Sequence, residues 1–171
     1  LSVLLILAML VCTVPAFAIL ATAEGETASS AWDGTSYDVS WCDTDTSDSG
    51  AEIDGKKYKV TGYTAEEAKT YEISTAEQLA GLAKLVNTNN KGDSFANVTV
   101  SLTADVDLGG KLWTMIGKNG KDYSGTCAFA GSFVGKKADG SNAVISNLTV
   151  KDGSDSQRCV GLFGLYRGPL M

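Results

Sequence analysis

Histidine is absent from all 171 residues of this chain. Imidazole is the general base of Ser-His-Asp and Cys-His enzymes and a common zinc ligand, so this segment excludes both kinds of catalysis and an ordinary zinc site. Proline is almost as scarce, because none occurs between Pro15 and Pro169. Proline lacks the backbone N–H that strand pairing needs, so its absence is compatible with long ladders of paired strands.

Charge is absent from the first 23 residues. The run from Leu1 to Val14 is almost wholly apolar, and residues 16–18 and 21–23 each fit the small-x-small pattern of a signal-peptidase site. This pattern predicts a signal peptide over residues 1–23, with a truncated start that lacks the basic region and the initiator Met. A membrane span is the weaker alternative, because the apolar run is short of the ~20 residues needed. Val11 precedes Cys12, which excludes a lipoprotein signal because a small residue is needed there.

Basic residues are outnumbered by acidic ones, and the formal net charge is −6 with an isoelectric point near 4.6. Between Glu24 and Asp54 there is no Lys or Arg at all. An acidic surface repels phosphate backbones and anionic lipid, so we expect no nucleic-acid partner and no docking on anionic membranes.

Cysteine is too scarce for a disulfide framework. The chain beyond the signal carries Cys42, Cys127 and Cys159, which is an odd number at uneven spacing. We expect three isolated small apolar residues, although Cys127 and Cys159 both lie in strand-like runs and could pair across stacked strands.

One helix is predicted over residues 75–88. Ser74 and Glu77 fit a capping box at its start, and Asn87 to Gly92 fit its end. The helix presents a single apolar stripe that must be buried against other elements. The stripe consists of Leu79, Leu82, Ala83 and Val86.

Short strands dominate the remainder. Asp54-Gly55 predicts a hairpin turn, and Val98, Val100 and Leu102 alternate with polar residues as in a strand. Further strand-like runs with glycine turns occur at 129–135 and 145–150. One amphipathic helix followed by many short strands predicts a β-solenoid or another all-β stack.

Two groups of carboxylates are candidate sites. Asp43, Asp45, Ser47 and Asp48 resemble the start of a calcium loop, but the glycine at the sixth position and the glutamate at the twelfth are missing, which favours a solvated acidic loop. Asp105 and Asp107 would share one strand face, where paired carboxylates can act as acid and base or hold calcium. A polar turn is the favoured interpretation, because two carboxylates alone specify no reaction.

Aromatic residues and sequons give weaker signals. Trp32, Trp41 and Trp113 could form a sugar-stacking platform, but such rings more often supply core area, and for Trp113 we favour the core. Asn97 and Asn147 each begin an Asn-x-Thr sequon, which matters only in a eukaryotic secretory pathway.

The order of several phrases resembles the bacterial GLUG-repeat surface proteins. Those phrases are Ile73–Ala83, Leu102–Leu108, Trp113–Gly117, Phe129–Gly135, Ile145–Val150 and Gly161–Gly164. The resemblance covers about residues 32–168 and includes a single Gly-Leu-Phe-Gly unit. It implies an extracellular, β-helix-like stalk or binding region, as in adhesins, and it supplies no catalytic, cofactor or metal-binding residues.

From these observations we expect a mostly β chain that begins a right-handed parallel β-helix, with the helix covering its open end. The expected domains are a signal peptide at 1–23, a polar and acidic segment with short strands at 24–72, and the capping helix with the first solenoid turns at 73–171. We expect a non-catalytic adhesion or ligand-display segment of a secreted or wall-attached protein, without cofactor or metal. Its ligands would be host molecules or carbohydrates, and no membrane span would remain after signal cleavage. The alternative is an accessory β-helix region of a surface glycan-active enzyme or peptidase.

Overall fold

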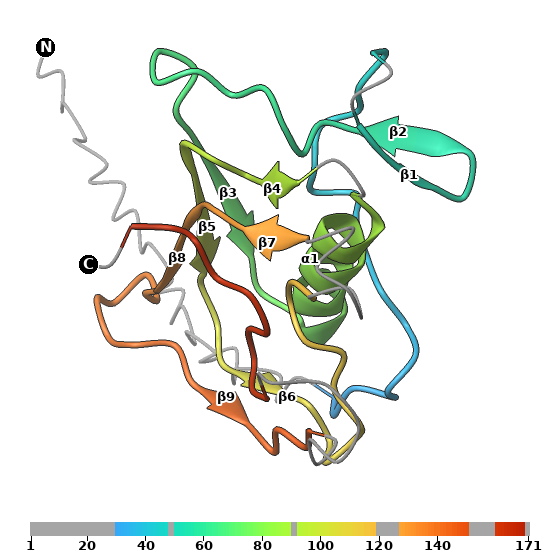
Figure 1. Ribbon diagram of the computed structural model, residues 1–171. Helices are drawn as coiled ribbons and strands as arrows, with labels where there is room; N and C mark the ends of the chain where they lie inside the picture. The colour runs from blue at the N-terminus through green and yellow to red at the C-terminus, as the bar shows by residue number, and fades with distance from the viewer. Residues whose placement is uncertain (1–29, 48–49, 90–91, 119–126, 151–159, 170–171) are drawn as a thin grey trace, which may run out of the picture.

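The computed structural model describes residues 30–47, 50–89, 92–118, 127–150 and 160–169. The predicted signal peptide, Asp48 and Cys159 lie outside these residues. The described chain contains one α-helix and nine short strands arranged in four small sheets (Figure 1).

The strands pair in two ways. β1 (Ala51–Ile53) and β2 (Lys56–Tyr58) form an antiparallel hairpin, whereas the other three sheets are parallel. The hairpin confirms the turn predicted at Asp54-Gly55, where both residues have positive φ, 51° and 75°, and glycine adopts such a conformation without strain.

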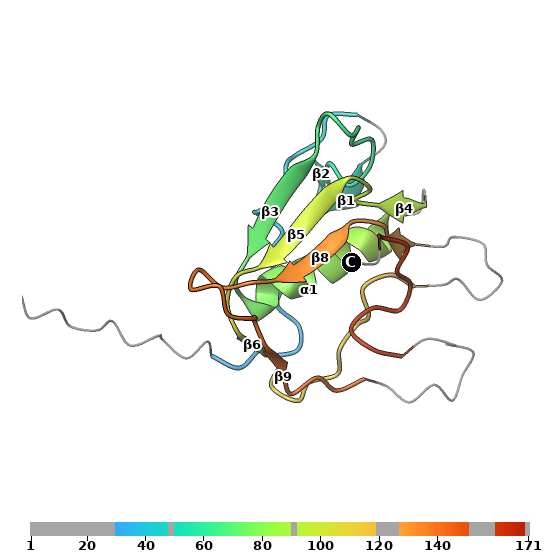
Figure 2. The ribbon, with the colours of Figure 1, turned by 90° about the vertical axis from the view of Figure 1, so that its left-hand side faces the viewer.

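The largest parallel sheet has the order β3-β5-β8, and Figure 2 shows its three strands side by side. Its strands are β3 (Lys69–Ile73), β5 (Val98–Leu102) and β8 (Ser132–Gly135). Two-stranded sheets join β4 (Asp93–Ser94) to β7 (Ala128–Phe129) and β6 (Val106–Asp107) to β9 (Ile145–Ser146). Alternate residues of β5 are buried, as its sequence predicts.

The helix α1 (Ala76–Thr88) confirms the prediction over 75–88 to within one residue. Its cap differs from the predicted one. Thr75, not Ser74, is the N-cap and accepts the Gln78 N–H at 3.2 Å, while the Gln78 side chain accepts the Ser74 N–H at 2.8 Å. Thr75 and Gln78 have the same spacing as Ser74 and Glu77, so the sequence is compatible with two capping boxes that differ by one residue.

The predicted apolar stripe of α1 is buried, but so are neighbouring positions. Leu79, Leu82, Leu85 and Val86 are all fully inaccessible to solvent. The helix contacts β1 and β7 and lies between them in Figure 1. One face of α1 therefore packs into the core against strands of two separate sheets, and the opposite side stays accessible.

The predicted right-handed β-helix is wrong. The described residues form four small, separate sheets of mixed orientation with a buried helix among them, and no solenoid. Short strand runs with glycine turns carry no information about whether the strands stack in one continuous coil, because each run only reports local β-structure.

The boundary expected between residues 72 and 73 falls inside β3. Residues on both sides of it belong to one hydrophobic cluster, in which Trp32 and Val39 pack together with Leu79 and Phe129. In the part of the chain that the structure describes, no helix combines the length and apolarity required to span a membrane.

Candidate functional site

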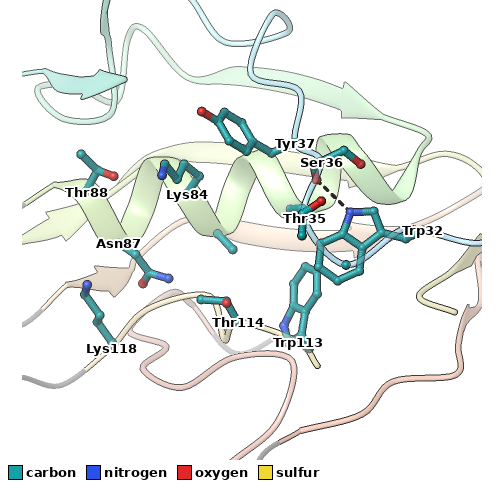
Figure 3. Close-up of a pocket in the computed structure, with 13 residues that line it drawn as sticks. Trp32, Thr35, Ser36, Tyr37, Lys84, Asn87, Thr88, Trp113, Thr114 and Lys118 are labelled. Carbon is teal, nitrogen blue, oxygen red and sulfur yellow. Dashed lines mark hydrogen bonds between the residues drawn. The ribbon is translucent and has the colours of Figure 1, made fainter. Parts of the chain in front are cut away.

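A pocket of about 360 Å³ lies along one side of α1 (Figure 3). Three chain segments form it: the loop at 32–37, the exposed side of α1, and the segment at 113–118. The lining residues are Trp32, Gly34, Thr35, Ser36, Tyr37, Ala80, Ala83, Lys84, Asn87, Thr88, Trp113, Thr114 and Lys118. The volume falls within the range of small-molecule sites.

Trp32 and Trp113 form one end of the pocket and connect two of its walls. Their rings meet edge to face with centroids 5.5 Å apart, and each side chain is at most 5% exposed. Both indole N–H groups are already used, since Trp32 donates to Ser36 O at 2.8 Å and Trp113 donates to Leu162 O at 3.1 Å. The pair is therefore a rigid wall and supplies no free hydrogen-bond donor.

The segment at 113–118 is held from behind by the Gly-Leu-Phe-Gly phrase. Ile116 donates its N–H to Leu162 O at 2.9 Å, and Gly164 donates to Ile116 O at 3.0 Å. The phrase that suggested a repeat thus supports one wall of the pocket.

Asn87 is the most unusual lining residue. Its Nδ2 donates to Met115 O at 2.8 Å, which fixes the amide orientation. Its Oδ1 is buried and has no hydrogen-bond partner. An unpaired buried acceptor costs about 1–3 kcal/mol, so a bound hydroxyl or N–H would recover part of that free energy.

The charged lining groups are both lysines. The Lys84 ammonium lies 5.2 Å from the centre of the Tyr37 ring, and the backbone of Lys118 is fixed by two hydrogen bonds with Cys127, of 2.9 and 3.0 Å. The Tyr37 hydroxyl donates to Asp54 at 2.8 Å, and this bond is the main cause that raises the Tyr37 pKa. Tyr37 is thus held protonated, and no Asp or Glu belongs to the pocket lining.

Asp105 and Asp107 do not form an acid–base pair. Asp105 accepts the Val144 N–H at 2.8 Å and a Lys137 ammonium hydrogen bond at 3.2 Å, while Asp107 accepts from Asn147 at 2.7 Å and from the Gly109 N–H at 2.8 Å. These bonds lower the pKa of both carboxyl groups. The largest cause is the Val144 bond for Asp105 and the Asn147 bond for Asp107. The two carboxylates connect β6 to β9, which agrees with the favoured structural interpretation.

The acidic loop is committed to internal contacts. Asp43 forms an ion pair with Lys69, and the hydrogen bond in this pair is the main reason that the Asp43 pKa is lowered. Asp45 accepts hydrogen bonds from the Ser47 N–H and hydroxyl, both at 2.8 Å. Within the described ranges, no three His, Cys, Asp or Glu side chains gather closely enough to hold a metal ion. Asp48 is outside those ranges, so the complete loop stays a prediction.

Two cysteines, Cys42 and Cys127, lie in the described parts of the chain. Cys42 and Cys127 are both buried, and burial raises the pKa of each thiol, for Cys42 to about 12. Such thiols are weak nucleophiles because the thiolate is scarce at neutral pH. The alternative pairing of Cys127 with Cys159 stays a prediction, because Cys159 lies outside the described residues.

Trp32 and Trp113 are core residues, as favoured for Trp113, and Trp41 is partly buried and packs against the core. Trp41 packs edge-on against Tyr71 at 5.3 Å and stacks on Phe95 at 6.1 Å. Trp41 therefore does not join the other two, and no sugar-stacking platform of three rings exists. The two sequon asparagines are exposed and have positive φ, and each donates its amide N–H, Asn97 to Tyr63 O and Asn147 to Asp107.

Sequence reasoning singled out both pocket tryptophans but missed Lys84, Asn87 and Lys118. Lys84, Asn87 and Thr88 follow helical spacing and so share one polar face of α1, which is the available signal. That signal does not reveal which distant segment lies opposite. No family model, curated protein or solved structure matches the chain.

Proposed function

We propose that this protein is a non-catalytic, ligand-displaying segment of a secreted or cell-surface protein, and that its pocket binds a carbohydrate. One observation carries the proposal: the pocket combines hydroxyl, amide and ammonium groups with a wall of two buried tryptophans. Sugars present many hydroxyl groups, and each needs a partner of this kind when water is displaced.

The hydroxyl-bearing residues support this chemistry. Thr35 and Thr114 are exposed at the pocket, and Ser36, Tyr37 and Thr88 are partly exposed. A hydroxyl group both donates and accepts, so it can pair with either role of a sugar hydroxyl. Export and surface location rest on the predicted signal peptide and on the resemblance to GLUG-repeat proteins, and both stay predictions.

A non-catalytic role is supported by the state of the reactive groups. The glycan-active version of the enzyme alternative drew on Asp105 and Asp107, and both carboxylates are occupied by structural hydrogen bonds. The Cys42 thiol is buried with a raised pKa. These groups give the enzyme hypothesis no support.

The test is a binding measurement with a blocked pocket. Ligand-observed NMR on the full chain would screen neutral and acidic methyl glycosides. Thr114→Trp adds a large ring at the pocket and is expected to abolish the signal. Thr70→Trp, at an exposed position of β3 that is no part of the lining, is the matched control and should bind normally. Absence of binding by every glycoside, or equal binding by Thr114→Trp, would contradict the proposal.

A further inference from the structure

We infer that the pocket selects a saccharide unit that carries a carboxylate, and that Lys84 and Lys118 hold this group. The inference deepens the proposed function and rests on it. Figure 3 shows both lysine side chains at the same end of the pocket, on either side of Asn87, with the tryptophans at the other end. The pocket is therefore cationic at one end and aromatic at the other.

The charge of this pocket is opposite to that of the chain. The formal net charge of the protein is −6, yet the charged lining residues are two lysines and no carboxylate. Moving a carboxylate from water into a pocket is favourable only where positive charge compensates the lost hydration. A pocket without acidic groups also avoids repulsion between like charges.

Three other lysines of the fold are neutralised by acidic side chains. Lys59, Lys69 and Lys137 each form an ion pair, with Glu67, Asp43 and Asp105. In the described parts of the chain, Lys84 and Lys118 form no ion pair. Lys84 lies instead over the Tyr37 ring, a contact that orients its ammonium group and leaves its charge uncompensated.

Asn87 provides the second observation. Its oxygen is buried and has no donor, while its Nδ2 donates to Met115 O at 2.8 Å. In Figure 3 the Asn87 side chain points from the helix toward the segment that carries Thr114 and Lys118. A ligand that suits this end needs an anionic group for the lysines and an adjacent hydroxyl to donate to Asn87 Oδ1. A uronic acid has both groups on one ring.

The closed aromatic end favours a ligand that terminates in the pocket. About 360 Å³ accommodates one sugar ring and its substituents, and the buried tryptophan pair blocks extension beyond that end. We therefore expect recognition of a single acidic sugar unit, at a chain end or on a branch.

The experiment compares three probes on the full chain by NMR titration: methyl β-D-glucuronide, methyl β-D-glucoside and acetate. The two glycosides differ only in the carboxylate, and acetate supplies the carboxylate without the ring. We expect the glucuronide to bind more tightly than either, and its affinity to fall as ionic strength rises. Lys84→Gln and Lys118→Gln should each weaken glucuronide binding about two- to fivefold, since exposed charge pairs contribute at that level. Lys56→Gln, at an exposed lysine of the β1–β2 hairpin, is the matched control.

The outcomes separate this inference from the proposed function. Equal binding of glucuronide and glucoside, insensitive to both lysine variants, would overturn the carboxylate selection and leave carbohydrate binding intact. Acetate binding as tight as glucuronide would overturn the sugar requirement and define a plain anion site. Binding of none of the three probes, together with no signal in the wider glycoside screen, would overturn both.

Discussion

The indole rings of Trp32 and Trp113 meet at a centroid distance of 5.5 Å with planes inclined by 66°, although the two residues are far apart in the sequence. The contact holds the loop at 32–37 against the segment at 113–118, so the pocket exists only when both segments are in place. The site therefore depends on the packing of residues 32–37 against residues 113–118.

The first prediction concerns this pair. Trp113→Ala removes a side chain that is 4% exposed and leaves a cavity beside Trp32, so we expect the free energy of unfolding to fall by about 3–5 kcal/mol. Urea denaturation followed by circular dichroism measures the loss. Leu112→Ala is the control, because Leu112 is 57% exposed and its truncation should stay within about 0.5 kcal/mol. A similar loss of unfolding free energy in both variants would show that the Trp32–Trp113 contact does not stabilise the core.

A second prediction follows from Asp33. Its carboxylate accepts hydrogen bonds from the Thr35 and Ser36 N–H groups at 2.6 and 2.7 Å. These bonds, with the Ser36 bond as the largest cause, lower the pKa of Asp33 from 3.8 to about 2. A lowered pKa in the folded state gives stability that is complete above the unfolded value and is lost as pH falls from about 4 through 2. Asp33→Asn keeps an acceptor oxygen but cannot titrate.

The urea midpoint of Asp33→Asn should therefore fall less between pH 4 and pH 2 than that of the parent chain. Other carboxylates with lowered pKa values, such as Asp139 at its turn, titrate in both proteins and cancel in the difference. Parallel pH curves for the two proteins would contradict the assignment.

A third prediction concerns Cys42. The side chain is 5% exposed, and burial raises its pKa to about 12, so native protein should resist alkylation by iodoacetamide near pH 8. Peptide mass spectrometry identifies the labelled site, and labelling in urea is the positive control. Rapid alkylation of Cys42 under native conditions would show that the segment around it opens readily.

Local signals predicted local structure well. The helix at 76–88 and the hairpin at Asp54-Gly55 both follow from short-range spacing and turn chemistry, which the neighbouring residues determine. The wider arrangement did not follow, because strand runs such as 98–102 specify a burial pattern and not a partner. The same pattern suits a solenoid and a small separate sheet.

The candidate site was only half visible for a related reason. Trp32 and Trp113 stand out as large rings, whereas Lys84 and Asn87 look like ordinary residues on the polar side of a helix. Their significance depends on tertiary contacts, above all the Asn87 bond to Met115 O, that no periodicity encodes. The carboxylates show the reverse: Asp105 and Asp107 attract attention in sequence, yet their oxygens serve strand connections.

The fourth prediction reverses the usual effect of a helix substitution. Gly81 lies within α1, where alanine is ordinarily favoured over glycine by about 1 kcal/mol. Here a Cβ would collide with the backbone carbonyl of Asp38, and Val39 Cγ1 would lie only 3.2 Å away. The segment cannot retreat freely, because the Asp38 N–H donates to Glu77 O at 2.9 Å.

We therefore expect Gly81→Ala to destabilise the protein by about 1–3 kcal/mol, since backbone crowding outweighs the gain in helix propensity. Urea denaturation gives the magnitude. Gly161→Ala is the control, because the nearest atom to its Cβ would be Phe163 O at an ordinary 3.6 Å. A stabilised Gly81→Ala variant would mean that residues 38–39 do not rest on α1. The loop at 32–37 would then lose its support, and the pocket would lose one wall.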